Sequence, residues 1–210
     1  MKRFLPLLIL IVGLLVNGCV PPSTTQSPQK TWQSFKDKDQ FTDLESCSVS
    51  LNSKARTLAY TTLGYMPYIE LKNDTLRLGL HNINGIPVGD IQLRIDENKF
   101  HTITTSETPI DLFPQELSSN MENSMNMVNK ESLGAGINYE TMMNNMMKTL
   151  SPYTATTGDK AWTILNEMLK GKKMIYRTIG INQAASTTGE VLLDESLLQS
   201  LRECGIVKEE

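Results

Sequence analysis

The side chains of this sequence that could carry chemistry are thiols, thioethers and imidazoles. The chain contains three cysteines, eleven methionines and two histidines. A thiol can be acylated or joined in a disulfide, thioethers favour Cu(I) among the available metals, and an imidazole can act as a general base. Which of these roles is open to each residue depends on the elements that position it.

Cys19 follows a segment with the layout of a secretory signal. Lys2 and Arg3 precede an uncharged apolar run over residues 4–16, and the small residue Gly18 stands directly before the cysteine. A short basic start, an apolar middle and a small residue at the cleavage site are typical of such signals. The run is shorter than the roughly 20 helical residues that span a membrane, so a permanent transmembrane helix is disfavoured.

The Gly18–Cys19 junction resembles the lipobox of bacterial lipoproteins. In that family the cysteine thiol receives a diacylglycerol, the preceding peptide is removed, and the new amino terminus is usually acylated. The resemblance implies a signal peptide over residues 1–18, lipidation of Cys19, and contact with a membrane through the lipid. An Asp directly after Cys19 would resemble an inner-membrane retention signal. Val20 stands there instead, and the absence of that Asp favours the outer membrane. The alternative is an ordinary signal peptide that leaves Cys19 as a free thiol.

Cys47 and Cys204 remain as a pair once Cys19 is lipidated. In an oxidising periplasm two remaining cysteines are expected to form a disulfide. The chain-entropy model for so long a loop gives about 5 kcal/mol as an upper figure. We expect this disulfide to join the first core strand to the last helix. Two separate buried thiols are the alternative.

The composition predicts one globular domain behind a flexible tether. Residues 19–30 are rich in proline and small polar residues and cannot supply a core. Residues 31–210 are sufficient for a single domain. The net charge of -3 gives no basic footprint, so no nucleic-acid partner is expected. An aromatic fraction of 6% argues against a carbohydrate-stacking surface.

From Trp32 to about Thr105 the pattern indicates β-structure. Apolar and polar residues alternate over 76–80 and most clearly over 91–95. Turn residues at 72–74 and 96–98 each join two such runs. About six short strands in an antiparallel meander are expected, as part of an α+β fold with a β-rich domain (sandwich or meander).

A helical, methionine-rich insert is expected at about 115–150. Helical periodicity runs from Gln115 to Ser132, glycines at 134 and 136 interrupt it, and a second helix covers about 138–150. The methionines of this insert are Met121, Met125, Met127, Met142, Met143, Met146 and Met147. Three interpretations remain open for the four in the second helix: packing, an adaptable partner-binding face, or a Cu(I) site.

The last section returns to helices and strands. Asp159 is expected to cap a helix that Gly171 ends. A strand over 173–181, a second strand beginning at Glu190 and a helix that begins at Asp194 or Ser196 follow. The apolar residues expected on one face of the first helix are Ala161, Trp162, Leu165, Met168 and Leu169. Those expected on the inner side of the last helix are Leu197, Leu198, Leu201 and Cys204.

The order of elements in this section resembles the invasion-associated-locus-B-like group of exported proteins. Those proteins carry a helix, a basic-Gly-basic segment such as Lys170-Gly171-Lys172-Lys173, a strand, and a final helix with a cysteine. Cys47 after the aromatic-containing segment 32–41 fits the same pattern. The resemblance implies a disulfide-pinned, β-rich periplasmic domain linked with host-associated bacteria, and it transfers no active site.

No catalytic set is evident. His81 and His101 lie on expected strands without a neighbouring nucleophile motif, and the acids at turns and helix starts are explained by capping. The sequence therefore predicts a non-enzymatic, lipid-anchored binding or adaptor protein of the envelope, with no cofactor and with an envelope or host protein as partner. A Cu(I)-binding protein and a hydrolase are the alternatives.

Overall fold

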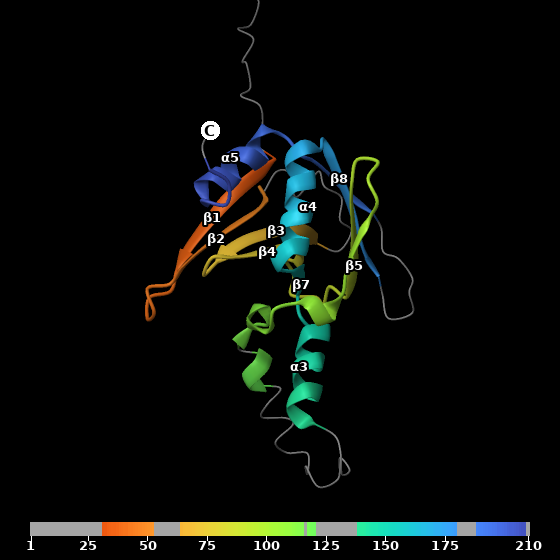
Figure 1. Ribbon diagram of the computed structural model, residues 1–210. Helices are drawn as coiled ribbons and strands as arrows, with labels where there is room; N and C mark the ends of the chain where they lie inside the picture. Colours follow the sequence, from red (N-terminus) through yellow and green to blue (C-terminus); the bar gives the residue numbers. More distant parts are fainter. Residues whose placement is uncertain (1–30, 53–63, 116, 121–137, 180–187, 209–210) are drawn as a thin grey trace, which may run out of the picture.

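A computed structural model describes residues 31–52, 64–115, 117–120, 138–179 and 188–208. Two antiparallel sheets and the helices packed with them make an α+β fold (Figure 1), as the sequence predicts. Within these residues the five-stranded sheet has the order β1-β2-β3-β4-β7 and the four-stranded sheet the order β6-β5-β8-β9.

The five-stranded sheet begins with a meander. Its strands are β1 (Trp32–Lys38), β2 (Glu45–Leu51), β3 (Tyr65–Lys72), β4 (Thr75–Asn82) and β7 (Tyr153–Thr156). Consecutive strands from β1 to β4 pair antiparallel, which confirms the expected meander. Asn73 and Asp74 form the tight turn between β3 and β4 with φ of 49° and 58°, the left-handed conformation that two-residue hairpin turns require.

The four-stranded sheet combines two distant parts of the chain. Its strands are β5 (Asp90–Ile95), β6 (His101–Ile103), β8 (Lys173–Ile179) and β9 (Gly189–Leu192). The β5–β6 hairpin confirms the turn expected at 96–98. β5 also pairs antiparallel with β8, so that Ile95 lies opposite Met174. The six strands expected before residue 105 are therefore divided between the two sheets.

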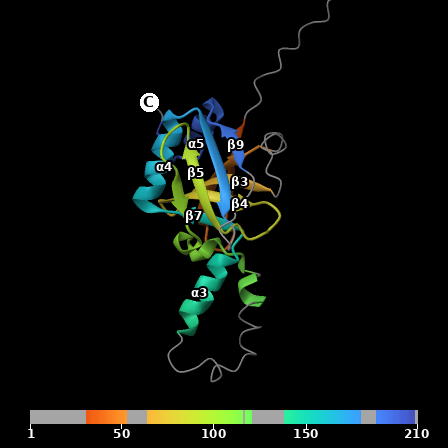
Figure 2. The same ribbon diagram turned by 90° about the vertical axis from the view of Figure 1, so that its right-hand side faces the viewer.

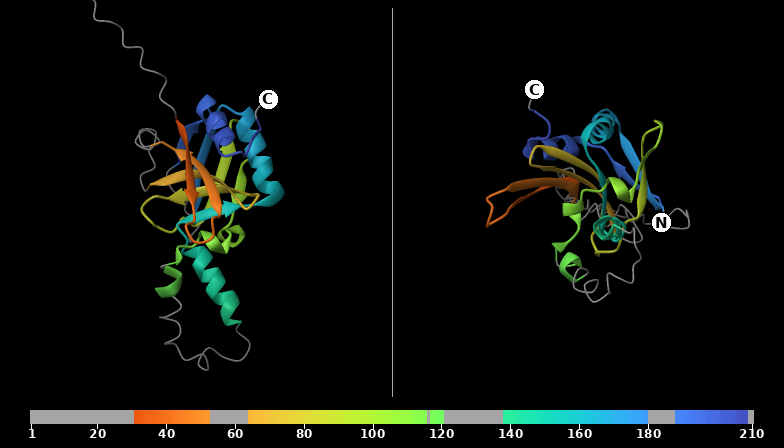
Figure 3. Two further views of the ribbon diagram at one scale, coloured as in Figure 1. Left: turned by 90° about the vertical axis from the view of Figure 1, so that its left-hand side faces the viewer. Right: turned by 60° about the horizontal axis from the view of Figure 1, so that its bottom comes forward.

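The helices differ in how they meet the sheets. They are η1 (Thr105–Glu107), η2 (Ile110–Leu112), α3 (Tyr139–Thr149), α4 (Gly158–Lys170) and α5 (Glu195–Glu203). α4 packs against β4, and α5 packs against β1 and β2. α3 projects from the end of the molecule opposite to the start of β1 (Figures 1 and 3).

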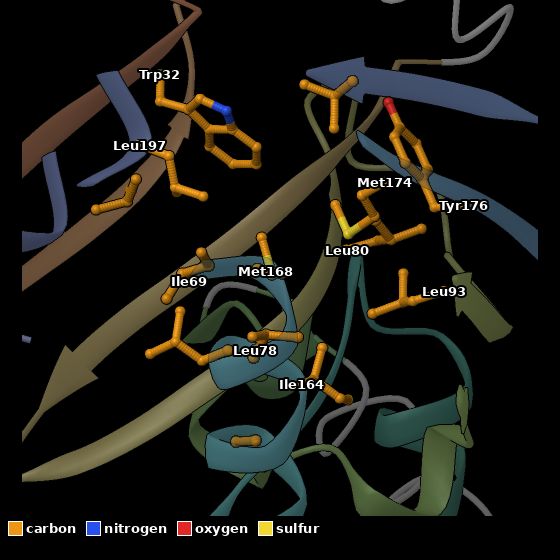
Figure 4. Close-up of a cluster of buried hydrophobic side chains, with 14 of the residues drawn as sticks. Trp32, Ile69, Leu78, Leu80, Leu93, Ile164, Met168, Met174, Tyr176 and Leu197 are labelled. Atoms are coloured by element: carbon orange, nitrogen blue, oxygen red, sulfur yellow. The ribbon is translucent and has the colours of Figure 1, made fainter. Parts of the chain in front are cut away.

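One core joins both sheets with α4 and α5 (Figure 4). Alternate residues of β4 and β5, such as Leu78 and Leu93, turn inward and meet Ile164 and Met168 of α4. Removing these side chains from water is the main favourable contribution to folding. The indole nitrogen of the buried Trp32 donates to the Leu192 carbonyl oxygen at 2.8 Å and links β1 to β9.

Two details of α4 differ from the sequence prediction. The N-cap is Thr157, and Asp159 lies inside the first turn. Trp162 and Leu169 are 40% and 36% exposed, whereas Ile164 is fully buried. The buried stripe follows Ala161, Ile164, Leu165 and Met168, at the i, i+3, i+4, i+7 spacing of one helix face. Trp162 and Leu169 lie on the margin of that stripe, which is narrower than expected.

The expected disulfide is present. Cys47 of β2 and Cys204, the C-cap of α5, are bonded at 2.01 Å. Because β1 precedes β2, the bond joins the last helix to the second strand and not to the first. The side chain of Asp194 accepts a hydrogen bond from the Ser196 backbone nitrogen, which confirms Asp194 as the start of α5. Gly171 ends α4 as expected.

The helix expected over about 138–150 is confirmed as α3. Its N-cap, Asn138, accepts a hydrogen bond from the Thr141 backbone nitrogen at 3.0 Å. The expected break at Gly134 and Gly136, and most of the expected first helix, lie outside the described residues. The same holds for residues 1–30, which include Cys19 and the tether.

Candidate functional site

The outer face of the five-stranded sheet is covered where η1 and η2 cross it, and we call this region the covered face. It includes Tyr68, Glu70, Arg77, Tyr153 and Ala155, which point away from the main core. Leu112 of η2 packs onto Tyr68 and Ala155. This cover buries residues that strand alternation alone would leave in water.

A buried ion-pair network lies on the covered face. Arg77 donates from Nη1 to Glu70 Oε2 at 3.2 Å and from Nη2 to Asp111 Oδ2 at 2.8 Å. Arg77 and Glu70 are only 7% and 9% exposed. Burial alone would raise the pKa of Asp111, but hydrogen bonds and attraction from Arg77 and, to a smaller extent, Lys72 outweigh it, and the pKa is lowered. Such a network fixes η2 on the sheet, which is a structural role.

A second set of contacts joins η1 to α4 and β7. Lys160 of α4 donates to both carboxylate oxygens of Glu107 at 2.9 and 2.8 Å and to the Thr102 carbonyl oxygen at 2.6 Å. Thr156 Oγ1 donates to the same carboxylate. Against the effect of burial, these hydrogen bonds and one from the Thr104 backbone lower the pKa of Glu107.

His81 stacks with tyrosines beside the covered face. Its ring centroid lies 5.7 Å from that of Tyr153 and 5.9 Å from that of Tyr68. Ser50 Oγ lies 3.3 Å from His81 Nε2 but donates its hydrogen to the Pro67 carbonyl oxygen at 2.8 Å. A serine whose proton is committed to a backbone carbonyl is not set up as a nucleophile with the imidazole as its base. This pair therefore does not favour the hydrolase alternative.

His101 has a different environment. Its Nε2 lies 2.9 Å from Glu167 Oε1, and Asn98 Nδ2 donates to the other oxygen of that carboxylate at 3.1 Å. These contacts tie the β5–β6 hairpin to α4. Across the described ranges, no three His, Cys, Asp or Glu side chains are grouped to hold a metal ion.

The outer face of the four-stranded sheet is open to solvent, and we call it the open face. Figure 2 looks onto it, and no described helix crosses it. The outward residues of β5 and β8 are Asp90, Gln92, Arg94, Lys173, Ile175, Arg177 and Ile179. Two apolar side chains border them: Phe100 is 51% exposed and Leu192 is 60% exposed.

A hollow of about 210 Å³ lies on the open face. Its lining includes Arg94, Phe100, Ile175, Arg177 and Thr188. The walls therefore combine an aromatic ring and an aliphatic side chain with two guanidinium groups. Arginine and aromatic residues are the types enriched at protein–protein interfaces. This combination suits an apolar or aromatic group that carries or adjoins a negative charge.

The two arginines of the hollow differ in their partners. Arg94 Nη2 lies 2.6 Å from a carboxylate oxygen of Glu97. Arg177 donates from Nε and Nη2 to the neutral Gln92 Oε1 at 2.8 and 2.5 Å. Within the described part of the chain, no carboxylate lies within ion-pair distance of Arg177. Its guanidinium is therefore held in place by a neutral acceptor.

The four methionines of α3 fall into two classes. Met143 and Met147 are buried, as the packing interpretation expects. Met142 and Met146 are half-buried, so part of each thioether remains accessible. A partner-binding face formed by all four is therefore reduced to these two.

The sequence alone does not predict the open face. The alternation of Gln92 and Arg94 with buried residues was visible, but Lys173, Ile175 and Arg177 lie about eighty residues further along the chain. Only the pairing of β5 with β8 brings them together. No family model, curated protein or solved structure matches this chain. In the described residues, no helix combines the length and apolar character needed to cross a membrane.

Proposed function

We propose that this protein is a lipid-anchored, non-enzymatic binding protein of the bacterial cell envelope. The observation that carries the binding proposal is the open face, where exposed apolar side chains and a guanidinium held by a neutral side chain surround a hollow. The anchor proposal depends on the lipobox-like sequence at Cys19. A charged or apolar surface alone does not define a catalyst, so binding is the simplest role for this face.

The shape of the molecule is compatible with an anchor at Cys19. The described chain starts at Thr31, at the end of the molecule opposite to α3 (Figures 1 and 3). A tether over residues 19–30 would hold that end near the bilayer and leave α3 pointing away from it. The open face lies along the side, where a partner in the same layer could reach it. Confinement to a thin layer raises the effective concentration of such partners.

The anchor is tested by replacing the lipidated thiol. Cys19→Ala should abolish incorporation of radiolabelled fatty acid and release the protein from the membrane fraction, because stable anchoring needs two or more acyl chains. A matched control is Cys47→Ala with Cys204→Ala, which removes the disulfide and leaves Cys19 in place. Labelling that persists in Cys19→Ala, or is absent from the parent, would reject the anchor.

The binding surface is tested by cross-linking in cells. The full chain is cross-linked, purified and examined for a stoichiometric envelope partner. Arg177→Glu should remove that partner, whereas Glu97→Gln, a change on an exposed turn nearby, should keep it. If deletion of residues 115–150 removes the partner and Arg177→Glu does not, α3 and not the open face is the binding surface.

The half-buried Met142 and Met146 favour α3 as a second candidate surface for an adaptable partner. The double variant Met142→Leu, Met146→Leu keeps the apolar volume and removes both thioethers. Unchanged binding of Cu(I) by this variant would exclude the copper alternative at these residues. Loss of Cu(I) binding with the fold retained would support it.

A further inference from the structure

The tip of the β1–β2 hairpin presents a single aromatic side chain to solvent. Phe41 is 98% exposed, and Leu44 beside it is also exposed. Asp39 holds the tip in one shape, since its carboxylate accepts hydrogen bonds from the Phe41 and Thr42 backbone nitrogens at 2.9 and 2.7 Å. A backbone bond from Asp43 to the Asp39 carbonyl oxygen closes the turn at 3.0 Å. The ring therefore projects from a fixed turn.

The hairpin tip is also acidic. Residues 36–45 contain four carboxylates and two lysines, which gives a net charge of −2. Hydrogen bonds from the backbone and side chain of Thr42 and from the Phe41 backbone lower the pKa of Asp39. The ligand that this tip fits is therefore an apolar hollow whose rim is positive. An anionic membrane surface is disfavoured as a target by the like charge.

The hollow of the open face has these properties. Its lining supplies Phe100 and Ile175 for contact with a ring, and Arg94 and Arg177 for cation–π contact and attraction to carboxylates. Its volume of about 210 Å³ is on the scale of one large side chain. The hairpin tip and the open face lie on opposite sides of the molecule (Figures 1 and 3), so they cannot meet within one copy.

We propose that Phe41 of one copy inserts into the hollow formed by Phe100, Ile175 and Arg177 of a second copy. The partner of the open face would then be this same chain, so the inference rests on the proposed binding function of that face. A contact between two different surfaces is heterologous and adds copies head to tail. The two surfaces lie on opposite sides of the axis that runs from Thr31 to α3. With the Thr31 end held near the bilayer, an array of copies would therefore extend parallel to the membrane.

The contact is small, which determines how it must be tested. One aromatic side chain with a few charges gives weak association in dilute solution, because the loss of translational and rotational freedom opposes it. Confinement on a membrane raises the effective concentration. The experiment therefore uses the full-length protein in intact cells, with a short bis-maleimide as the probe.

Two single replacements mark the two surfaces. The double variant Gln40→Cys, Thr188→Cys keeps Phe41 and Ile175 and places a thiol beside each surface, since Gln40 is exposed next to Phe41 and Thr188 lines the hollow. It should give a ladder of dimers, trimers and larger species on denaturing gels. Cells that co-express the two single variants should give one dimer band and no ladder. The matched control pairs Gln40→Cys with Thr163→Cys, an exposed position on α4, and should give at least tenfold less product.

A charge reversal tests the recognition. Arg177→Glu added to the ladder-forming pair should reduce cross-linking at least tenfold, and Glu45→Lys in the same chain should restore part of it. No ladder in the double variant, or an equal ladder with Thr163→Cys, overturns the proposal. Equal product from Gln40→Cys alone would indicate a symmetric contact and also overturn it. If the ladder is absent but Arg177→Glu still removes an envelope partner, only the self-association fails and the proposed function stands.

Discussion

The covered face and the open face place the same residue type in opposite environments. Arg77 on β4 points outward from the five-stranded sheet, yet it is buried and paired with Glu70 and Asp111. Arg177 on β8 points outward from the four-stranded sheet and stays exposed, with the Gln92 side chain as its hydrogen-bond acceptor. The difference lies in the chain that crosses the face, since η1 and η2 cover one sheet and no described helix covers the other.

This contrast separates structural charges from charges that are free to bind. A buried cation must be paired, because an uncompensated charge in a low-dielectric environment is very costly. An exposed cation on a regular strand contributes little to stability. Under the proposed binding function, its place on a regular sheet beside Phe100 and Ile175 makes it a contact for the partner. The predictions below test how far the distinction between the two faces holds.

Removal of the buried cation should have the largest effect. Arg77→Met keeps the aliphatic stem but leaves the buried Glu70 without its cation, whereas the more exposed Asp111 keeps its ion pair with Lys72 at 3.2 Å. We expect a loss of about 3–5 kcal/mol in the free energy of unfolding. Urea unfolding followed by circular dichroism measures it. The matched variant Arg177→Met on the open face should change stability by no more than about 0.5 kcal/mol.

Equal effects of the two arginine variants would contradict the comparison. A large loss for Arg177→Met would mean that the open face is covered in the folded protein. A small loss for Arg77→Met would mean that the network does not hold η2. The charge-neutral double variant Glu70→Gln, Arg77→Met distinguishes a lost pair from lost packing, because it removes the leftover charge of Glu70.

Arg77 and Arg94 show which part of the fold the sequence cannot predict. Leu76-Arg77-Leu78 and Leu93-Arg94-Ile95 have the same alternating pattern, and both were expected on strands, as observed. Alternation identifies which residues face outward, but not what crosses the outer face. Arg77 is buried because η2 returns over β3 and β4, a contact made by a distant segment without periodicity of its own.

Local signals were reliable elsewhere, and long-range pairing was not predictable. The turn at 72–74, the helix ends at Gly171 and Asp194, and the pair Cys47–Cys204 each depend on a few residues, and all were found. The pairing of β5 with β8 depends on the whole core. The open face exists only through that pairing, so its hollow could not be derived from the sequence.

A smaller effect is expected where two strands of the covered sheet approach closely. Gly79 lies on the outer side of β4, and an added Cβ would lie 1.9 Å from the Thr154 carbonyl oxygen of β7. Gly79→Ala should therefore separate β4 from β7 and cost about 1–3 kcal/mol. Differential scanning calorimetry would show the lowered melting temperature. Thr75→Ala, at an exposed position on the same strand, serves as the control and should change it little.

Acid should loosen the covered face in particular. The pKa values of Glu107 and Asp111 are lowered in the fold from their ordinary values of 4.5 and 3.8. Their contribution to stability is complete above those ordinary values and is lost as the pH falls through the lowered ones. Glu107→Gln should cost about 1–2 kcal/mol at pH 7, and the difference from the parent should shrink below about pH 4.

Urea midpoints at several pH values measure this acid sensitivity. Glu97→Gln beside the open face is the control, because Glu97 is almost fully exposed and its ion pair with Arg94 lies at the surface. Its difference from the parent should stay small at every pH. If the difference in unfolding free energy between Glu107→Gln and the parent is the same from pH 7 to pH 3, the Lys160 contact does not hold η1.

The smallest effect on stability is expected on the open face itself. Leu192 is 60% exposed, so Leu192→Ala removes little buried apolar area and should change the free energy of unfolding by less than about 0.5 kcal/mol. Leu112→Ala on the covered face removes a buried side chain that packs on Tyr68 and should cost about 2 kcal/mol or more. Parallel urea titrations compare them. Similar losses would mean that Leu192 has a partner within the fold, and the open face could not then be a free binding surface.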